Sequence, residues 1–169
     1  MKKDQFILGI HVSNQFGVLT RVSALFARRG FNIDSLTVGE TENPDYSRIT
    51  ITTHGDEYLE NQIIKQLRKL HDVKKIELMT NDDIIIRELL LLKVTVTNET
   101  HQGIMDAIEI YRSKVVDLSP KSMCIEITGE ASKLDAFIEY MKPFGILELC
   151  RTGIIAVNRG EITIYESKI

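Results

Sequence analysis

The sequence predicts an α+β fold made of two similar halves, each with the element order strand-helix-strand-strand-helix-strand. Apolar residues alternate over 5–12, which is typical of a strand, and from Val18 they recur at helical spacing. A second series with the same order of periods follows residue 80. This order gives each half a four-stranded antiparallel sheet with both helices on one face.

Turn and capping residues bound the elements of the first half. The expected elements are a strand at 5–12, a helix from Val18, strands at 31–40 and 47–53, a helix opened by Asp56 and Glu57, and a strand at 73–79. Arg28 and Arg29 suit the negative end of the first helix dipole, and Gly30 is placed as its C-terminal cap. The Asn-Pro pair within 41–45 predicts a turn. The third strand alternates isoleucines with Arg48, Thr50 and Thr52, which predicts one solvent-exposed face.

A polar stretch at 80–83 (TNDD) marks the expected boundary between a domain at 1–80 and a domain at 81–169. The second series comprises a strand at 85–96, a helix with Ile104, Ile108 and Tyr111, strands at 115–118 and 123–128, a helix with Leu134, Phe137, Ile138 and Met141, and a strand at 146–150. Each half has only about 80 residues, so its own core is marginal and packing between chains would help. A homodimer is therefore expected.

Bulk composition is that of an ordinary cytoplasmic globular protein. Apolar residues make up 43%, and the net charge of −3 gives no electrostatic case for nucleic acid or an acidic membrane surface. Cys124 and Cys150 lie far apart without a CxxC motif, so neither a disulfide framework nor a zinc site is indicated. The N-terminus lacks the apolar core of a signal peptide, and the apolar stretch at 84–92 is too short to span a membrane.

No catalytic or metal-binding constellation is found in the sequence. The four histidines are scattered without a pair at metal-ligand spacing, and no phosphate-binding loop, GxSxG or HExxH motif occurs. The third strand has no aromatic residue on which a nucleobase could stack. We therefore expect no catalytic residue, no metal ion and no cofactor in this chain.

The loop between the first strand and the first helix is the best candidate for a binding site. The first N–H groups of a helix have no internal partner and suit a carboxylate, and Gly17 would let a ligand approach the backbone. The amide oxygens of Asn14 and Asn32 are suited to accept hydrogen bonds from an ammonium group. Together these groups describe a site for a free amino acid. The alternative is an ordinary loop with an asparagine cap and a turn glycine.

Longer motifs connect the chain to a known family. The segment 14–51 contains N-x-x-G-x-L, then R-x-x-x-L-F and RGFNIDSLTV, and ends in DYSRITI. Further matches are KQLRKLHDV, RELLLLKV at 87–94, and the segment 129–160, which runs from GEASKLDAF to AVNRG. In these motifs, over essentially its whole length, the chain resembles the regulatory (small) subunit of acetolactate synthase, also called acetohydroxyacid synthase.

The resemblance implies a fold and a function. The first half is similar to an ACT domain, a ferredoxin-like module that binds amino acids and pairs with another copy. The second half is similar to the C-terminal ferredoxin-like domain of these subunits, which is expected to contact the catalytic subunit. Such proteins bind and activate the catalytic (large) subunit, which carries thiamine diphosphate, magnesium and FAD. They also confer feedback inhibition by valine in branched-chain amino acid biosynthesis.

By the same resemblance, the effector contacts fall on Asn14, Gly17 and Asn32. Further candidate contacts are Gln15, Phe16, Val18, Thr20 and Ile33. Valine would lie between two ACT domains, with the Gly17 loop from one chain and Asn32 from the other. Gln15 and Phe16 stand where family members often carry acidic or small residues, which leaves leucine and isoleucine open as effectors.

Two other classes of function fit the sequence less well. A free-standing amino-acid sensor that controls transcription would need a helix-turn-helix or a basic stripe, and neither half offers one. A small enzyme would need a pocket with matched acid and base residues, which the sequence does not supply.

Overall fold

The computed structural model describes residues 4–79 and 84–166, which fall into two compact units. The first unit holds 4–79, 84–85 and 154–166, and the second holds 86–153. The predicted boundary at 80–83 lies outside the described residues. The structure differs from the expected second domain, 81–169, at its C-terminal end, because 154–166 packs with the first unit.

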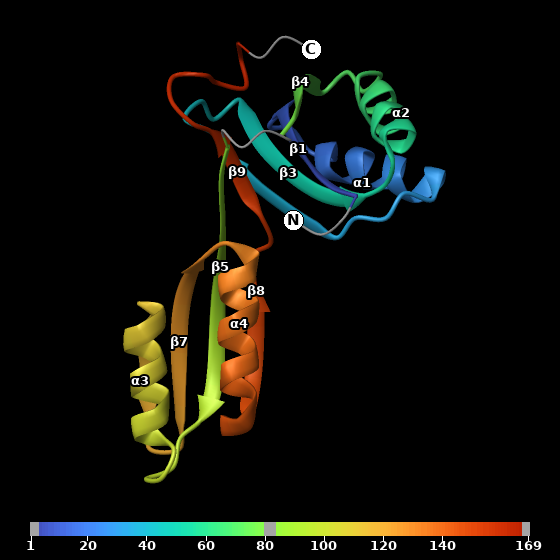
Figure 1. The fold of residues 1–169 in the computed structure, drawn as a ribbon. Helices are drawn as coiled ribbons and strands as arrows, with labels where there is room; N and C mark the ends of the chain where they lie inside the picture. Colours follow the sequence, from blue (N-terminus) through green and yellow to red (C-terminus); the bar gives the residue numbers. More distant parts are fainter. Residues whose placement is uncertain (1–3, 80–83, 167–169) are drawn as a thin grey trace. The chain divides into compact units, whose positions relative to one another are not determined.

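The first unit contains the predicted βαββαβ order. Its elements are β1 (Gln5–Ser13), α1 (Val18–Arg29), β2 (Ser35–Glu40), β3 (Tyr46–His54), α2 (Glu57–Leu67) and β4 (Val73–Leu78). The strands form one antiparallel sheet in the order β2-β3-β1-β4, with α1 and α2 on one face (Figure 1). The core between this face and the helices includes Leu8, Ile10, Val22, Phe26, Ile49, Ile51, Ile63 and Leu67. The predicted arrangement of the first half is confirmed.

Glycine and aspartate residues end or begin the helices as the sequence predicts. Gly30 follows α1 with φ 69°, and its N–H bonds back to the helix, so the predicted C-terminal cap is confirmed. The Asp56 side chain accepts a hydrogen bond of 2.8 Å from the N–H of Leu59 and caps α2. The second strand was predicted to begin at residue 31, but it begins at Ser35, because the N–H of Phe31 still donates to the Phe26 carbonyl oxygen at the end of α1.

The second face of the first sheet was expected to be exposed, and this expectation is wrong. Ile7, Thr50 and Thr52 are at most 3% exposed. The segment 154–166, which we call the C-terminal strap, covers this face with buried side chains of its own, Ile154, Ala156 and Ile164. In Figure 1 the strap is drawn in red, on the side of the sheet away from α1 and α2. It includes β9 (Ile155–Asn158), a strand that the sequence analysis did not predict.

The second unit repeats the βαββαβ order with its own core. Its elements are β5 (Ile84–Thr95), α3 (His101–Tyr111), β6 (Lys114–Ser119), β7 (Ser122–Gly129), α4 (Ala131–Met141), a short 3₁₀ turn (Lys142–Phe144) and β8 (Ile146–Arg151). The strand order is β6-β7-β5-β8, and β9 also pairs with β5. Leu90, Leu92, Ile125 and Phe137 are fully buried between this sheet and the two helices. No helix in the described part of the chain is long and apolar enough to cross a membrane.

Candidate functional site

The loop that joins β1 to α1 contains a glycine in a left-handed backbone conformation. Gly17 lies at φ 80° and ψ −1°, a left-handed conformation that a residue with a Cβ rarely adopts. This conformation turns the chain from β1 into α1, which begins at the next residue. The turn itself therefore favours glycine at position 17, whatever the loop binds.

Unpaired N–H groups open the first turn of α1. The N–H of Val18 donates to the carbonyl oxygen of Gln15 at 3.3 Å. The N–H groups of Leu19 and Thr20 have no hydrogen-bond partner among the described residues. No side chain caps the helix, and no acidic residue lies in its first turn. The positive end of the helix dipole is thus open to an anionic group.

Arg21 adds a full positive charge beside this helix start. A Cβ placed on Gly17 would lie 3.0 Å from Nη1 of Arg21, so the guanidinium lies directly against the glycine. Nη2 also donates to the carbonyl oxygen of Phe16 at 3.5 Å. The side chain is 46% exposed and so accessible to a ligand. The sequence analysis missed Arg21, although its position one helical turn after Gly17 was a usable signal.

Asp72 holds Arg21 in this position. The Nε atom of Arg21 donates to Oδ2 of Asp72 at 2.7 Å, and this hydrogen bond keeps the pKa of the Asp72 carboxyl below its usual value. The Asp72 carbonyl oxygen accepts a hydrogen bond of 2.9 Å from the N–H of Ser13, at the end of β1. Because Nη1 is not used by Asp72, the guanidinium keeps a donor for a second carboxylate.

Asn14 lies at the same end of α1 and is held by the turn between β2 and β3. Its Nδ2 donates to the carbonyl oxygen of Pro44 at 2.9 Å and to Oε2 of Glu40 at 3.3 Å. Its backbone N–H donates to the carbonyl oxygen of Asp45 at 2.7 Å. With Nδ2 used in this way, Oδ1 is the atom left to accept a hydrogen bond from an ammonium group.

Asn32 lies at the opposite end of α1 from Asn14. A helix of 12 residues is ~18 Å long, so one chain cannot bring these two amides onto one amino acid. The Asn32 Nδ2 donates to Oδ1 of Asp34 at 2.7 Å. The backbone carbonyl oxygen of Asn32 accepts a hydrogen bond from the Thr53 hydroxyl at 2.7 Å. The structure thus places Gly17 and Asn14 together and Asn32 apart from them.

The remaining predicted contacts divide by exposure. Gln15, Phe16 and Thr20 are exposed around the loop, and the Phe16 side chain is fully in solvent. Val18 is buried in the core and Ile33 packs against it, so their side chains are directed into the protein. Val18 contributes to this site only through its backbone.

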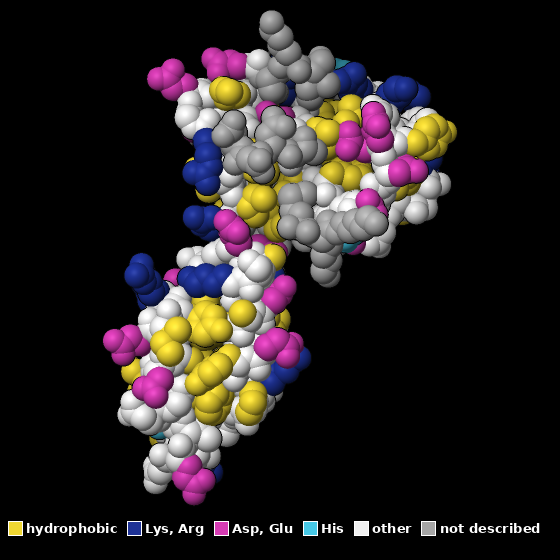
Figure 2. Space-filling model, viewed as in Figure 1, with side chains coloured by type: hydrophobic (Ala, Val, Ile, Leu, Met, Phe, Trp, Pro, Cys, Tyr) yellow, Lys and Arg dark blue, Asp and Glu magenta, His cyan; other side chains and the backbone are white. Residues whose placement is uncertain are grey.

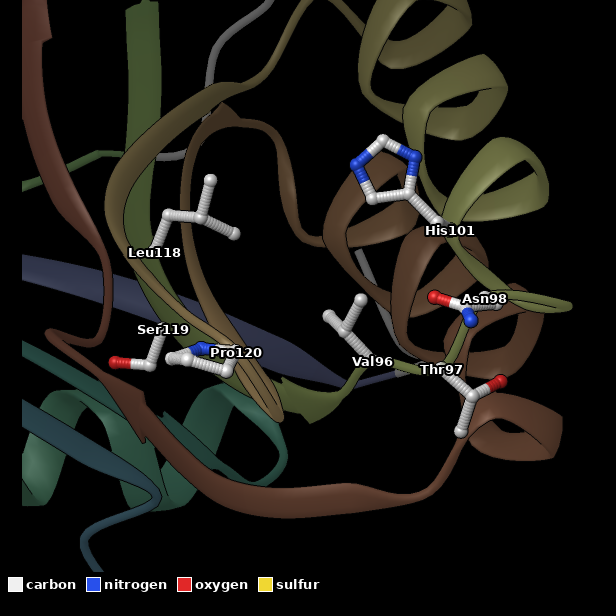
Figure 3. Close-up of a pocket in the computed structure, with 7 residues that line it drawn as sticks. All are labelled: Val96, Thr97, Asn98, His101, Leu118, Ser119 and Pro120. Atoms are coloured by element: carbon white, nitrogen blue, oxygen red, sulfur yellow. The ribbon is translucent and has the colours of Figure 1, made fainter.

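A hollow in the second unit offers no comparable chemistry. It has a volume of about 530 Å³ and is lined by Val96, Thr97, Asn98, His101, Leu118, Ser119 and Pro120 (Figure 3). The Thr97 hydroxyl lies 3.1 Å from the Thr100 hydroxyl and points away from the hollow. His101 is the one titratable side chain in this lining, which therefore gives no matched acid and base. Within 4–79 and 84–166, no group of three or more histidine, cysteine or acidic residues could hold a metal ion.

Comparisons with known proteins agree over both units. The model of the "AHAS small subunit-like ACT domain" matches residues 8–75, and the model of the "Small subunit of acetolactate synthase" matches residues 87–160. The acetolactate synthase small subunit of Mycolicibacterium smegmatis is 45% identical over 161 residues, which is 95% of each chain. The Bacillus subtilis small subunit is 45% identical over 156 residues, which is 91% of this chain and 90% of that one.

A solved structure supports the same relationship. The crystal structure of the acetolactate synthase small subunit from Thermotoga maritima superposes with a TM-score of 0.88 at 41% identity. The match covers 94% of this chain and 99% of that one. The chain therefore belongs to the family of acetolactate synthase small subunits and carries an N-terminal ACT domain of the type found in that family.

Proposed function

We propose that this chain is a regulatory subunit that binds valine, or another branched-chain amino acid, at an interface between two ACT domains. The observation that carries the proposal is the arrangement around Gly17, where two unpaired N–H groups and the Arg21 guanidinium surround a residue without a side chain. A carboxylate fits this arrangement because it meets the open N–H groups of a helix start and the Nη1 donors of a guanidinium together. The side chains placed here bind and orient, and none of them is set up to make or break a bond.

Asn14 and Asn32 supply the other end of the amino acid from two different chains. Asn14 Oδ1 accepts a hydrogen bond from the ammonium group of the ligand near the loop, and Asn32 of a second copy contacts the same ligand. This assignment follows from the separation of the two amides within one chain. The exposed Phe16, Leu19 and Val38 side chains supply apolar surface for such a dimer.

The function we infer needs a second protein. As a small subunit, the chain binds and activates a catalytic (large) subunit, to which thiamine diphosphate, magnesium and FAD belong. The second unit is the proposed contact surface. Hydrophobic side chains reach its surface over α3 and α4 (Figure 2), among them Met105, Ile110 and Tyr140. An effector then inhibits by binding two states of the complex with different affinity.

A charge placed at position 17 tests the site. In Gly17→Asp the carboxylate meets the Arg21 guanidinium, fills the ligand's space and repels the ligand's own carboxylate. We expect valine inhibition of the reconstituted holoenzyme to be lost, with activation of the catalytic subunit retained. Gly17→Asn is the matched control, because it adds nearly the same volume without charge and asparagine tolerates the left-handed backbone.

Calorimetry of the purified chain with valine, leucine and isoleucine identifies the effector. The proposal predicts binding of at least one of them to the unmodified chain, and weaker binding to Gly17→Asp than to Gly17→Asn. Full valine inhibition of the Gly17→Asp holoenzyme would show that the site is assigned wrongly.

A further inference from the structure

The C-terminal strap is held on the first sheet by polar contacts to β2, β3 and β4 and to the turn between β2 and β3. The N–H of Ile154 donates to the Ser35 hydroxyl on β2 at 3.4 Å. Nη2 of Arg48 on β3 donates to the carbonyl oxygen of Ala156 at 2.9 Å. In two further contacts, Nδ2 of Asn158 donates to Oε1 of Glu77 on β4 at 2.7 Å, and the Tyr165 hydroxyl donates to Oε1 of Glu42 at 3.0 Å.

A gap in the sheet surface makes the Arg48 contact possible. A Cβ on Gly9 would lie 3.0 Å from Nη2 of Arg48, 3.2 Å from Sδ of Met79 and 3.5 Å from Cδ1 of Ile164. The arginine therefore crosses β1 over the glycine, between the sheet and the strap. Among the residues that the structure describes, Nε of Arg48 has no hydrogen-bond partner, and neither has Nδ1 of His11 or Oε2 of Glu77. Buried polar atoms without partners lower the stability of the docked strap.

The turn between β2 and β3 contacts both the strap and the proposed effector loop. On one side, Asn14 binds the carbonyl oxygens of Pro44 and Asp45. On the other side, Glu42 binds the hydroxyl of Tyr165. Tyr46, directly after the turn, packs on the His11 ring at 4.6 Å, and the other neighbour of that ring is Tyr165 at 4.8 Å. The turn at 41–45 thus contacts both the loop at Asn14 and the strap at Tyr165, which are about 150 residues apart in the chain.

We propose that the strap is a releasable clamp coupled to the amino-acid site through the 41–45 turn. An amino acid that fixes Asn14 orders the turn, keeps Glu42 in place for Tyr165 and favours the docked strap. The strap follows the second unit directly in the chain, beginning one residue after Gly153. Its docking therefore carries the state of the effector site to the unit that we propose contacts the catalytic subunit. This inference rests on the proposed function for its ligand, but the coupling itself is a property of the chain alone.

Hydrogen exchange of the full chain tests the coupling without a ligand. Asn14→Ala removes the side-chain hold on the turn, and we expect the amides of 155–166 to exchange about two- to tenfold faster. Tyr165→Phe removes the bond to Glu42, and we expect a similar increase in the amides of 14–17. Asn61→Ala and Tyr58→Phe are matched controls on α2. The Asn61 side chain donates to the Glu57 carbonyl oxygen of its own helix, and Tyr58 is 72% exposed.

The outcomes separate the two proposals. Unchanged strap exchange in Asn14→Ala, or equal effects of Asn14→Ala and Asn61→Ala, would overturn the coupling. A uniform increase that includes the core amides of Ile10 and Ile49 would also overturn it, because that pattern reports general loss of stability. In the unmodified chain, valine that slows exchange at 17–20 without slowing it in the strap contradicts the coupling. If valine does not change exchange at 17–20, the proposed function is contradicted. The comparison of Asn14→Ala with Asn61→Ala still decides the coupling, because it uses no ligand.

Discussion

Ile164 and Ile162 lie two residues apart on the C-terminal strap and differ sharply in burial. Ile164 is 5% exposed and its Cδ1 lies against Gly9 of β1, whereas Ile162 is 62% exposed. If the strap is part of the first unit's core, only the first of these side chains contributes to stability. The pair Ile164→Ala and Ile162→Ala therefore compares the same chemical change at a docked and an undocked position.

The expected magnitude follows from the groups removed. Isoleucine to alanine deletes three carbon groups, and burial of each is worth about 0.8 kcal/mol, which gives about 2.4 kcal/mol. A residual cavity would add to this cost, but the strap is a single segment that closes onto the sheet, so the addition is small. We expect Ile164→Ala to lower the free energy of unfolding by about 2–3 kcal/mol, and Ile162→Ala by less than about 0.5 kcal/mol.

Urea unfolding followed by far-ultraviolet circular dichroism measures both variants, since the chain has no tryptophan for fluorescence. Hydrogen exchange of the β1 amides assigns the transition to the first unit. Equal losses in the two variants would refute the docking of the strap and, with it, the coupling built on it.

Two further predictions concern the effector loop and the buried histidine. Arg21→Gln removes the cation beside Gly17, and we expect calorimetry to show about 10- to 100-fold weaker valine binding. Arg28→Gln, at the other end of α1, is the control. Equal weakening of valine binding in both variants would contradict the role of Arg21. Burial lowers the pKa of His11, with Arg48 acting in the same direction and Glu42 opposing. Its other neighbours are Lys75, which lies opposite it on β4, and the Tyr46 and Tyr165 rings, which pack on it. The folded chain thus binds a proton at His11 less readily than the unfolded chain does. The contribution of His11 to the free energy of unfolding is therefore highest above about pH 6.5, where His11 is neutral in both states, and it declines as the pH falls below that value. Urea unfolding from about pH 7.5 to about pH 5.5 should show a shallower loss in His11→Phe, which keeps a ring between the tyrosines, and an unchanged slope would contradict the assignment.

Local signals in the sequence were sufficient for the elements and for part of the site. The change from alternating to helical spacing at Val18, and the glycines at 17 and 30, predict α1 to within a residue, because periodicity and left-handed glycines are properties of the local chain. The same signals indicated the loop at Asn14 and Gly17. They placed Arg21 one helical turn after Gly17 but could not show that its guanidinium lies against the glycine, since its orientation is fixed by Asp72, which is 51 residues away.

The sequence by itself determined the two βαββαβ units, because each strand and helix carries its own apolar period and its own caps. Only the tertiary structure decided where residues 154–166 pack. The strand face with Arg48, Thr50 and Thr52 has the polar pattern of an exposed surface, and it is buried because a distant segment supplies partners and apolar cover. Only the tertiary structure, too, put the Arg21 guanidinium against Gly17, since it is held there by Asp72 from a distant part of the chain.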